Sequence, residues 1–492
     1  MTEEARAQRL ILRGGASAGA GLAMRLGARL VFLAIAAQLY GAALFGAFSL
    51  AVAVVELAVA VGGLGMKRYL FKLLDERGER PEGHVLLDAV LLVASTSLAL
   101  GALIAFAALA APAKMLATQT AFALAWIAPM VAGQALLDLF LAATRSKHRM
   151  RYEVAARSLV EPVVGAVVAV AAWLAGFDLA GLLFAYAAGT LAALAYAANG
   201  TRLCFGSLGV AHYRPRPTML AATLRATALP TATDAVAAFF GRADLYLVGV
   251  FLGETPAGVY AMARQVRTPI RQARQAFDSL LTPIVATTLS ADGPASTSAA
   301  IASATRMILA IQLAGMLAFL AVGQPLLAWF GPEFAPAYVA LLLLAAAETI
   351  QGAFSISDLL LLYLRARLAL AVTFAMIAVY LVTAVPLIGA YGIDGAAFAV
   401  LFAIASGALL RRWLLRSRFG LAPPLLHCAG PLLAALVAAI VALAAHRYVA
   451  VNAPVSFHLG VLAAVLAVYA AALMLWQRTT GETLRLTGFR AA

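Results

Sequence analysis

The sequence predicts an all-α polytopic membrane protein with about 14 transmembrane helices. Hydrophobic residues make up 64% of the 492 residues and charged residues only 12%, whereas soluble domains average roughly 45–50% and 25%. The mean hydropathy is +0.94. Apolar runs recur along the whole chain, and each is long enough for the roughly 20 residues that a spanning helix needs. This composition excludes a soluble enzyme and a nucleic-acid-binding domain.

The apolar runs define the expected helices in order. The first run follows Arg6, Arg9 and Arg13 and continues as a full span, so we expect a retained anchor rather than a cleaved signal peptide. The longest gap, near 199–225, is too short for a catalytic domain. The expected spans lie near residues 16–38, 43–66, 84–110, 117–143, 154–174, 178–198, 226–252, 256–288, 299–322, 335–362, 368–388, 393–415, 425–446 and 456–477.

The basic residues between the spans predict the orientation. With these boundaries, and with Arg411 and Arg412 at the end of their span counted with the gap that follows, 25 of the 36 Lys and Arg residues lie on one side and only two, Lys114 and Arg447, on the other. Because short cytoplasmic loops carry an excess of Lys and Arg, we expect both termini in the cytoplasm of a bacterial inner membrane. The net charge of +14 is therefore mostly a topology signal and does not indicate nucleic-acid binding.

Three matches at nearly constant spacing indicate an internal repeat of six helices. Gly41-Ala-Ala-Leu-Phe-Gly46-Ala-Phe48 corresponds to Gly253-Glu-Thr-Pro-Ala-Gly258-Val-Tyr260, at an offset of 212 residues. Two acidic residues repeat as well, Asp138 as Asp358 and Asp178 as Asp394. An even number of spans gives both copies the same orientation. We expect lobes at 1–200 and 201–418, with two appended spans and a tail at 419–492.

The glycine motif and the two six-helix halves resemble bacterial polysaccharide flippases. The resemblance rests on the Gly-x4-Gly-x-aromatic turn after spans 1 and 7 and on the stretch from Gly241 to Arg264. These flippases belong to the multidrug/oligosaccharidyl-lipid/polysaccharide (MOP) exporter superfamily, and fourteen spans are usual in the polysaccharide-transport branch. The glycines also suit tight turns between helices, which is the simpler explanation for them.

Span 8 holds the densest set of charges inside the membrane. Arg264, Arg267, Arg271, Arg274 and Asp278 fall within an arc of about 80° on a continuous helix. Guanidinium groups stay charged and bind phosphate through two parallel hydrogen bonds, so this stripe suits a diphosphate headgroup. The alternative is that the arginines reach a membrane interface or pair with acids.

Spans 1, 2, 7 and 10 carry further candidates. Arg25 and Arg29 share one face of span 1, and the resemblance to lipid II flippases favours a role in substrate binding; pairing with Glu56 is the alternative. Span 7 holds Arg242, which also fits a charge pair between helices. The candidate coupling or charge-locking acids are Glu56, Asp234, Asp244, Asp278 and Glu348. The repeated Asp138 and Asp358 suggest bonds between helix ends.

These features favour a flippase that moves polyprenyl-pyrophosphate-linked oligosaccharide to the outer leaflet, by alternating access of two lobes around a cationic cleft. Membrane lipids and other polysaccharide-assembly proteins are the further expected partners, and nucleic acid is not. We expect neither covalent catalysis, a cofactor nor a metal, since the chain has no phosphate-binding loop and no metal spacing. The alternatives are an ion-coupled multidrug exporter of the same superfamily, a membrane glycan polymerase and an inactive scaffold.

Overall fold

The structure is a computed structural model that describes residues 3–112, 117–206, 209, 213–275, 293–420, 428–448 and 453–480. Side chains are described for these residues except 3–26, 293–301, 303–304, 366 and 446–448. Within the described ranges every regular element is a helix. The chain divides into two compact units, Met1–Gly258 and Val259–Ala492.

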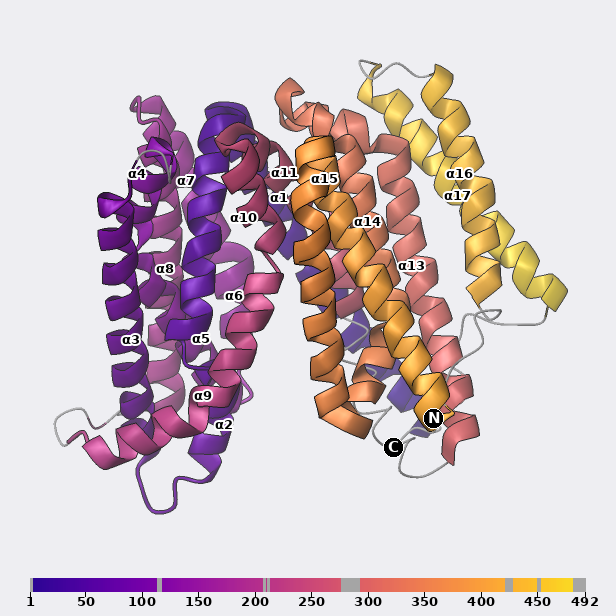
Figure 1. Ribbon diagram of the computed structural model, residues 1–492. Helices are drawn as coiled ribbons and strands as arrows, with labels where there is room; N and C mark the ends of the chain where they lie inside the picture. The colour runs from indigo at the N-terminus through magenta and orange to yellow at the C-terminus, as the bar shows by residue number, and fades with distance from the viewer. Residues whose placement is uncertain are drawn as a thin grey trace. The chain divides into compact units, whose positions relative to one another are not determined.

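The N-terminal unit is a helical bundle in which α1 packs against α4, α5, α7 and α9 (Figure 1). Apolar side chains of α2, α3 and α5 form one core, and α5, η1 and α8 form another. The helices of this unit are α1 (Glu3–Gly62), α2 (Met66–Asp75), α3 (Glu82–Ala110), α4 (Thr118–Ile127), α5 (Met130–Ser146), α6 (Arg151–Ala155), the π-helix η1 (Ala156–Val160), α7 (Glu161–Leu174), α8 (Leu179–Phe205), α9 (Pro217–Phe240) and α10 (Ala243–Leu252).

The C-terminal unit begins within α11 (Glu254–Val266). Its other helices are α13 (Gly293–Phe330), the 3-10 helix η3 (Pro332–Ala337), α14 (Tyr338–Ala353), α15 (Ser355–Phe419), α16 (Ala429–Tyr448) and α17 (Val455–Thr480). The last two helices pack together on α13. The Tyr469 hydroxyl donates to the Ala310 carbonyl at 2.9 Å, and the Arg306 guanidinium lies 5.5 Å from the centre of the Trp476 ring. The expected appended spans therefore form one hairpin on α13.

The helices are those of a multi-pass membrane protein. Among the described residues, eight are long and apolar enough to cross a membrane, or ten if each bent pair is one span. Two of the helices are far longer than a bilayer needs, since α1 has 60 residues and α15 has 65. Non-helical backbone at Gly41, Arg365 and Gly392 divides them between the expected spans. The membrane-spanning class is confirmed, and the count of fourteen stays a prediction.

The glycines that open the two copies of the repeated motif have the same unusual backbone conformation. Gly41 has φ 74° and ψ 172°, and Gly253 has φ 88° and ψ −170°. This region of positive φ with extended ψ is open essentially to glycine alone. The expectation that these glycines serve as tight turns is confirmed at both positions, and the match supports the internal repeat.

The second glycines of the motif pack against each other within the N-terminal unit. A Cβ atom on Gly46 would overlap the carbonyl of Glu254, and one on Gly258 would overlap the carbonyl of Ala42. Because Ala42 and Glu254 also correspond at the offset of 212, the contact is reciprocal and has local two-fold symmetry. The absence of side chains lets the backbones of α1 and α11 touch, as small residues do in membrane helix pairs.

Charged segments gather at one end of the N-terminal unit, where α2 lies (Figure 1). Lys147 after α5 pairs with Glu82 at 2.5 Å, and Arg80 pairs with Asp88 at 2.5 Å. The Tyr213 hydroxyl donates to the same Asp88 at 2.6 Å. Burial and this bond to a carboxylate raise the pKa of Tyr213. Three segments expected on one side of the membrane therefore meet, and which side that is stays a prediction.

The division at residue 258 differs from the lobe boundary that we expected near residue 200. Helices α9 and α10 pack on α1, so they join the N-terminal unit as a compact body. The repeat relates helices by their order along the chain, whereas the two units are defined by how compactly their residues pack. The lobe assignments 1–200, 201–418 and 419–492 stay predictions.

The glycine contact gives a stability prediction. Replacing Gly46 with Ala places a methyl group where the Glu254 carbonyl lies, and overpacking of this kind costs about 1–3 kcal/mol. We expect a lower melting temperature for the purified protein in detergent. The matched control is Gly389→Ala, because Gly389 has no atom within 4 Å of an added Cβ. Equal melting temperatures for the two variants would contradict the close packing.

Candidate functional site

The arginines of the expected eighth span lie on two consecutive helical segments rather than on one helix. Helix α11 ends at Val266, Arg267 lies in a turn, and residues 268–275 are helical again. The cause is Pro269, which has no N–H group and whose ring clashes with the preceding turn. Arg264, Arg271 and Arg274 are partly exposed, whereas Arg267 is buried. A continuous helix would place these arginines within a single arc of about 80°, and the break changes their directions relative to one another.

Arg267 and Glu348 form a buried ion pair in the C-terminal unit. The Arg267 Nη1 atom lies 3.5 Å from Glu348 Oε1, and the side chains are 7% and 5% exposed. Glu348 belongs to α14 and is held by its backbone as well, since the Gln312 amide on α13 donates to its carbonyl at 3.0 Å. Two of our candidate residues thus meet, one proposed for phosphate binding and one for coupling.

The candidates on α9, on α10 and between them also have polar partners. Arg242 pairs with Glu56 on α1, which fits a charge pair between helices. Asp234 lies 3.4 Å from Arg68, whose side chain is 80% exposed. Asp244 is buried, and its carboxylate accepts the N–H of Leu245 at 2.9 Å.

Three candidates remain. Arg29 on α1 is partly buried and interacts electrostatically with Glu161 on α7. The side chain of Arg25 and the whole of Asp278 lie outside the described residues. Their roles stay predictions.

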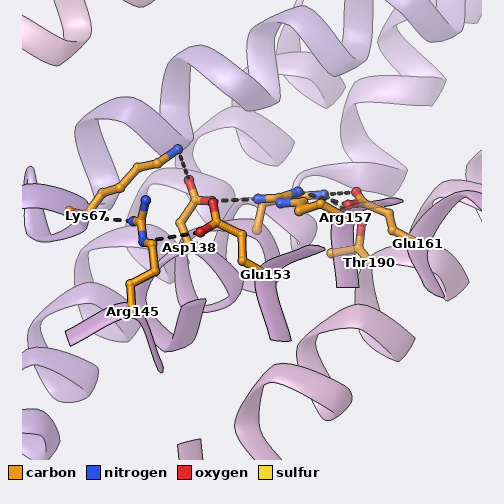
Figure 2. Close-up of polar contacts among 8 residues, drawn as sticks. Lys67, Asp138, Arg145, Glu153, Arg157, Glu161 and Thr190 are labelled. Atoms are coloured by element: carbon orange, nitrogen blue, oxygen red, sulfur yellow. Dashed lines mark hydrogen bonds and ion pairs between the residues drawn. The ribbon is translucent and has the colours of Figure 1, made fainter. Parts of the chain in front are cut away.

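A larger network in the N-terminal unit was not expected from the sequence (Figure 2). Arg157 lies at its centre, 2.6 Å from Asp138 and 3.0 Å from Glu161. It also donates to the Gln134 amide oxygen at 2.9 Å. The Gln134 nitrogen then donates to Glu161 and to the Thr190 hydroxyl at 3.0 and 2.9 Å. The sequence does contain one signal for this network, because Arg157 and Glu161 lie four residues apart within one expected span.

A π-helix positions Arg157. The π-helix η1 covers Ala156–Val160, directly before Pro162 near the start of α7. Because Pro162 has no N–H, the Ser158 carbonyl loses its usual α-helical donor, and the backbone widens to i→i+5 bonds. Single π-turns occur often at functional sites. Here the widened turn carries Arg157, which lies between Asp138 and Glu161.

Asp138 also lines a cavity of about 340 Å³ in the N-terminal unit. The cavity is bordered by Lys67, whose ammonium lies 3.7 Å from Asp138. Arg68, Arg145 and Asp234 complete its charged wall. Three cations and two carboxylates border it, so its charges are partly balanced.

The repeated aspartates do bond helices within their own units. Asp138 on α5 binds Arg157 on η1, and Asp358 near the start of α15 lies 2.5 Å from Arg411 near its end. Asp358 and Arg411 are separated by the breaks at Arg365 and Gly392, so the bond joins separate helical segments. The structural role that we expected for the repetition is confirmed in both units.

A family model for polysaccharide biosynthesis proteins matches residues 11–288, more than half of the chain. The chain belongs to this family. The match includes the repeated glycine motif and the arginines up to Arg274. No curated protein matches the sequence.

Solved structures of transporters share the fold of this family member. The lipid II flippase MurJ in an inward closed conformation matches with a TM-score of 0.74 at 13% identity, covering 94% of this chain and 99% of that one. An inward-facing multidrug resistance MATE transporter of the MOP superfamily matches with a TM-score of 0.64 at 13% identity, covering 80% and 94%. A mutant of the Vibrio cholerae MATE transporter VcmN gives 0.55 at 16%, covering 81% and 94%.

The fold is therefore that of the MOP superfamily, as the resemblance implied. Solved structures of a flippase and of membrane transporters share this fold. At 13–16% identity these structures establish the fold and leave the substrate open.

The network around Arg157 gives a second stability prediction. Replacing Arg157 with Gln removes the closest cation from Asp138 and Glu161, and breaking such a pair costs about 1–3 kcal/mol when its groups are partly exposed. We expect a lower melting temperature that the added change Asp138→Asn partly restores. Arg151→Gln, an exposed cation on α6, should lie within about 0.5 kcal/mol of the wild type. Equal effects of the two arginine variants would contradict the network.

Proposed function

We propose that the protein flips polyprenyl-pyrophosphate-linked oligosaccharide from the cytoplasmic to the outer leaflet for surface polysaccharide synthesis. The observation that carries the proposal is the set of four arginines along α11 and residues 268–275 in a chain of the polysaccharide biosynthesis family. Four guanidinium groups within a membrane span are costly unless they meet an anion or water. A pyrophosphate headgroup supplies the anion.

In the proposed cycle the protein forms no covalent bond with its cargo and is not an enzyme. The pyrophosphate binds the guanidinium groups of Arg264, Arg267, Arg271 and Arg274, and Arg25, Arg29 and Arg242 are the further proposed contacts. Alternating access of two lobes then exposes the headgroup and glycan on the other side, while the polyprenyl tail stays in lipid. Such rocking around a fixed site is general among transporters built from repeats.

The proposed location is the inner membrane of a bacterium, with both termini in the cytoplasm. The support is the excess of Lys and Arg in the segments that meet at the α2 end of the N-terminal unit. Membrane lipids are direct partners there. Other polysaccharide-assembly proteins are further proposed partners, since the cargo must be made before the flip and polymerised after it.

An ion-coupled multidrug exporter is the second candidate, because MATE transporters share the fold. Two observations favour the flippase. The MurJ structure covers 94% of this chain, whereas the two MATE structures cover 80% and 81%. The charge is also of the wrong sign for cationic drugs, since the chain carries seven candidate arginines in its spans.

The proposal is tested in cells that lack this chain. We expect loss of surface polysaccharide and accumulation of its lipid-linked precursor, and wild-type protein should restore both. A protein with Arg264 and Arg271 changed to Gln should restore less than about a tenth of the surface polysaccharide, since each lost charge-assisted hydrogen bond weakens binding by roughly 1.5–3 kcal/mol. The control is Arg478→Gln, an exposed residue at the end of α17.

Expression in the membrane must be equal for all variants. Unchanged polysaccharide together with altered sensitivity to cationic drugs would contradict the flippase and favour the exporter.

A further inference from the structure

The ion pair between Arg267 and Glu348 is more buried than the other pairs with a described geometry, and its contact is long. Its side chains are 7% and 5% exposed, and the closest charged atoms are 3.5 Å apart. In contrast, Arg411 and Asp358 are 2.5 Å apart with the carboxylate 42% exposed. A pair at 3.5 Å without solvent keeps the attraction between the charges but lacks a well-formed hydrogen bond.

Three buried polar atoms around this pair have no hydrogen-bond partner in the structure. They are Arg267 Nε, Glu348 Oε2 and the amide oxygen of Gln312. Gln312 belongs to the same cluster, because its amide nitrogen donates to the Glu348 carbonyl. Unsatisfied buried polar atoms are rare in native proteins, and each calls for an explanation such as a functional role or a bound water or ion. Arg267 therefore keeps hydrogen-bonding capacity that Glu348 does not use.

A phosphate oxygen is a stronger partner for a guanidinium than this single long contact. Arginine binds phosphate with two parallel short bonds. Arg264 and Arg271 lie three residues before and four residues after Arg267 and are less buried, so we take a headgroup held by them to lie next to Arg267. Phosphate binding would then take the guanidinium from Glu348.

Loss of this cation would leave the Glu348 carboxylate, whose side chain is 5% exposed, as a buried charge without its counter-ion. An unpaired buried carboxylate costs several kcal/mol, and such a group takes up a proton instead. We propose that Glu348 takes up one proton from water when the phosphate of the lipid-linked substrate displaces it from Arg267, so that this pair couples proton binding to substrate binding. The step forms one O–H bond on the carboxylate, and it neutralises one of the charges that enter with the phosphate. This inference rests on the proposed function.

Other ionisable groups on the elements around α14 do not replace Arg267 as the counter-ion. Tyr260 on α11 and Tyr380 on α15 are fully buried phenols, neutral near pH 7. Arg264 interacts electrostatically with Tyr380. Asp358 and Arg411 on α15 pair with each other. On α13, Arg306 lies over the Trp476 ring. Within the described residues, Arg267 is the cation with a direct contact to the Glu348 carboxylate.

The test is binding of farnesyl diphosphate to the purified full-length protein in nanodiscs, followed by titration calorimetry. Titrations in two buffers of different ionisation enthalpy give the number of protons taken up on binding. We expect the wild type to take up about one proton more than Glu348→Gln at pH 7.5. The variant should bind at least about tenfold more tightly there, because it needs no proton and each unit of pH changes proton-linked binding by that factor.

Asp358→Asn is the matched control, since it removes a carboxylate from another ion pair of the same unit. It should take up the same number of protons as the wild type. The titration of the ligand's own phosphates is common to all three proteins and cancels in the comparison. Equal proton uptake by the wild type and Glu348→Gln would overturn the inference and leave the flippase intact. No binding of farnesyl diphosphate to the wild type would overturn the proposed function and the inference with it.

If the Glu348→Gln protein fails to fold, the inference is still tested by a measurement on the wild type alone. Difference infrared spectra should show the C=O stretching band of a protonated carboxylic acid when farnesyl diphosphate is added. The same band should appear for Asp358→Asn. A spectrum without this band in the wild type, at saturating ligand, would overturn the inference.

Discussion

A charged side chain inside the hydrocarbon region of a membrane must be compensated by a partner, by water or by a ligand. This constraint accounts for the ion pairs of the described spans. Arg157 is compensated by Asp138 and Glu161 with short bonds, and Arg411 is compensated by Asp358. The Nε atom of Arg267 has no hydrogen-bond partner among the described residues beside its buried ion pair with Glu348, and for that reason we assign the phosphate of the cargo to this part of the chain.

The two copies of the repeat share backbone geometry but differ in their charges. The first glycine of each motif has the same positive φ, and both repeated aspartates bind an arginine on another helical segment. The backbone of the motif is fixed by sterics, which leaves little freedom. The charge pairs are free to differ, because any partner within reach satisfies them. We infer that the N-terminal unit uses its network around Arg157 for stability.

The sequence predicted the helical membrane class, the repeat and several ion-pair residues, because hydrophobic length and glycine turns are local signals. It did not predict which charges pair. Glu56 was considered as a partner of the span 1 arginines, and the structure pairs it with Arg242. The network around Arg157 was missed because its members come from four elements, α5, η1, α7 and α8. The break at Arg267 follows from Pro269. This signal was present in the sequence, but the prediction assumed a continuous helix through it.

The most direct test of the account is transport by the purified protein in proteoliposomes. A fluorescent polyprenyl-pyrophosphate-linked oligosaccharide is placed in both leaflets, and an impermeant reagent quenches the outer one. We predict that the quenched fraction rises beyond the outer-leaflet share in liposomes with protein, in proportion to its amount, and that protein-free liposomes show no such rise. Quenching equal to that of protein-free liposomes, together with uptake of a cationic dye, would contradict the central claim.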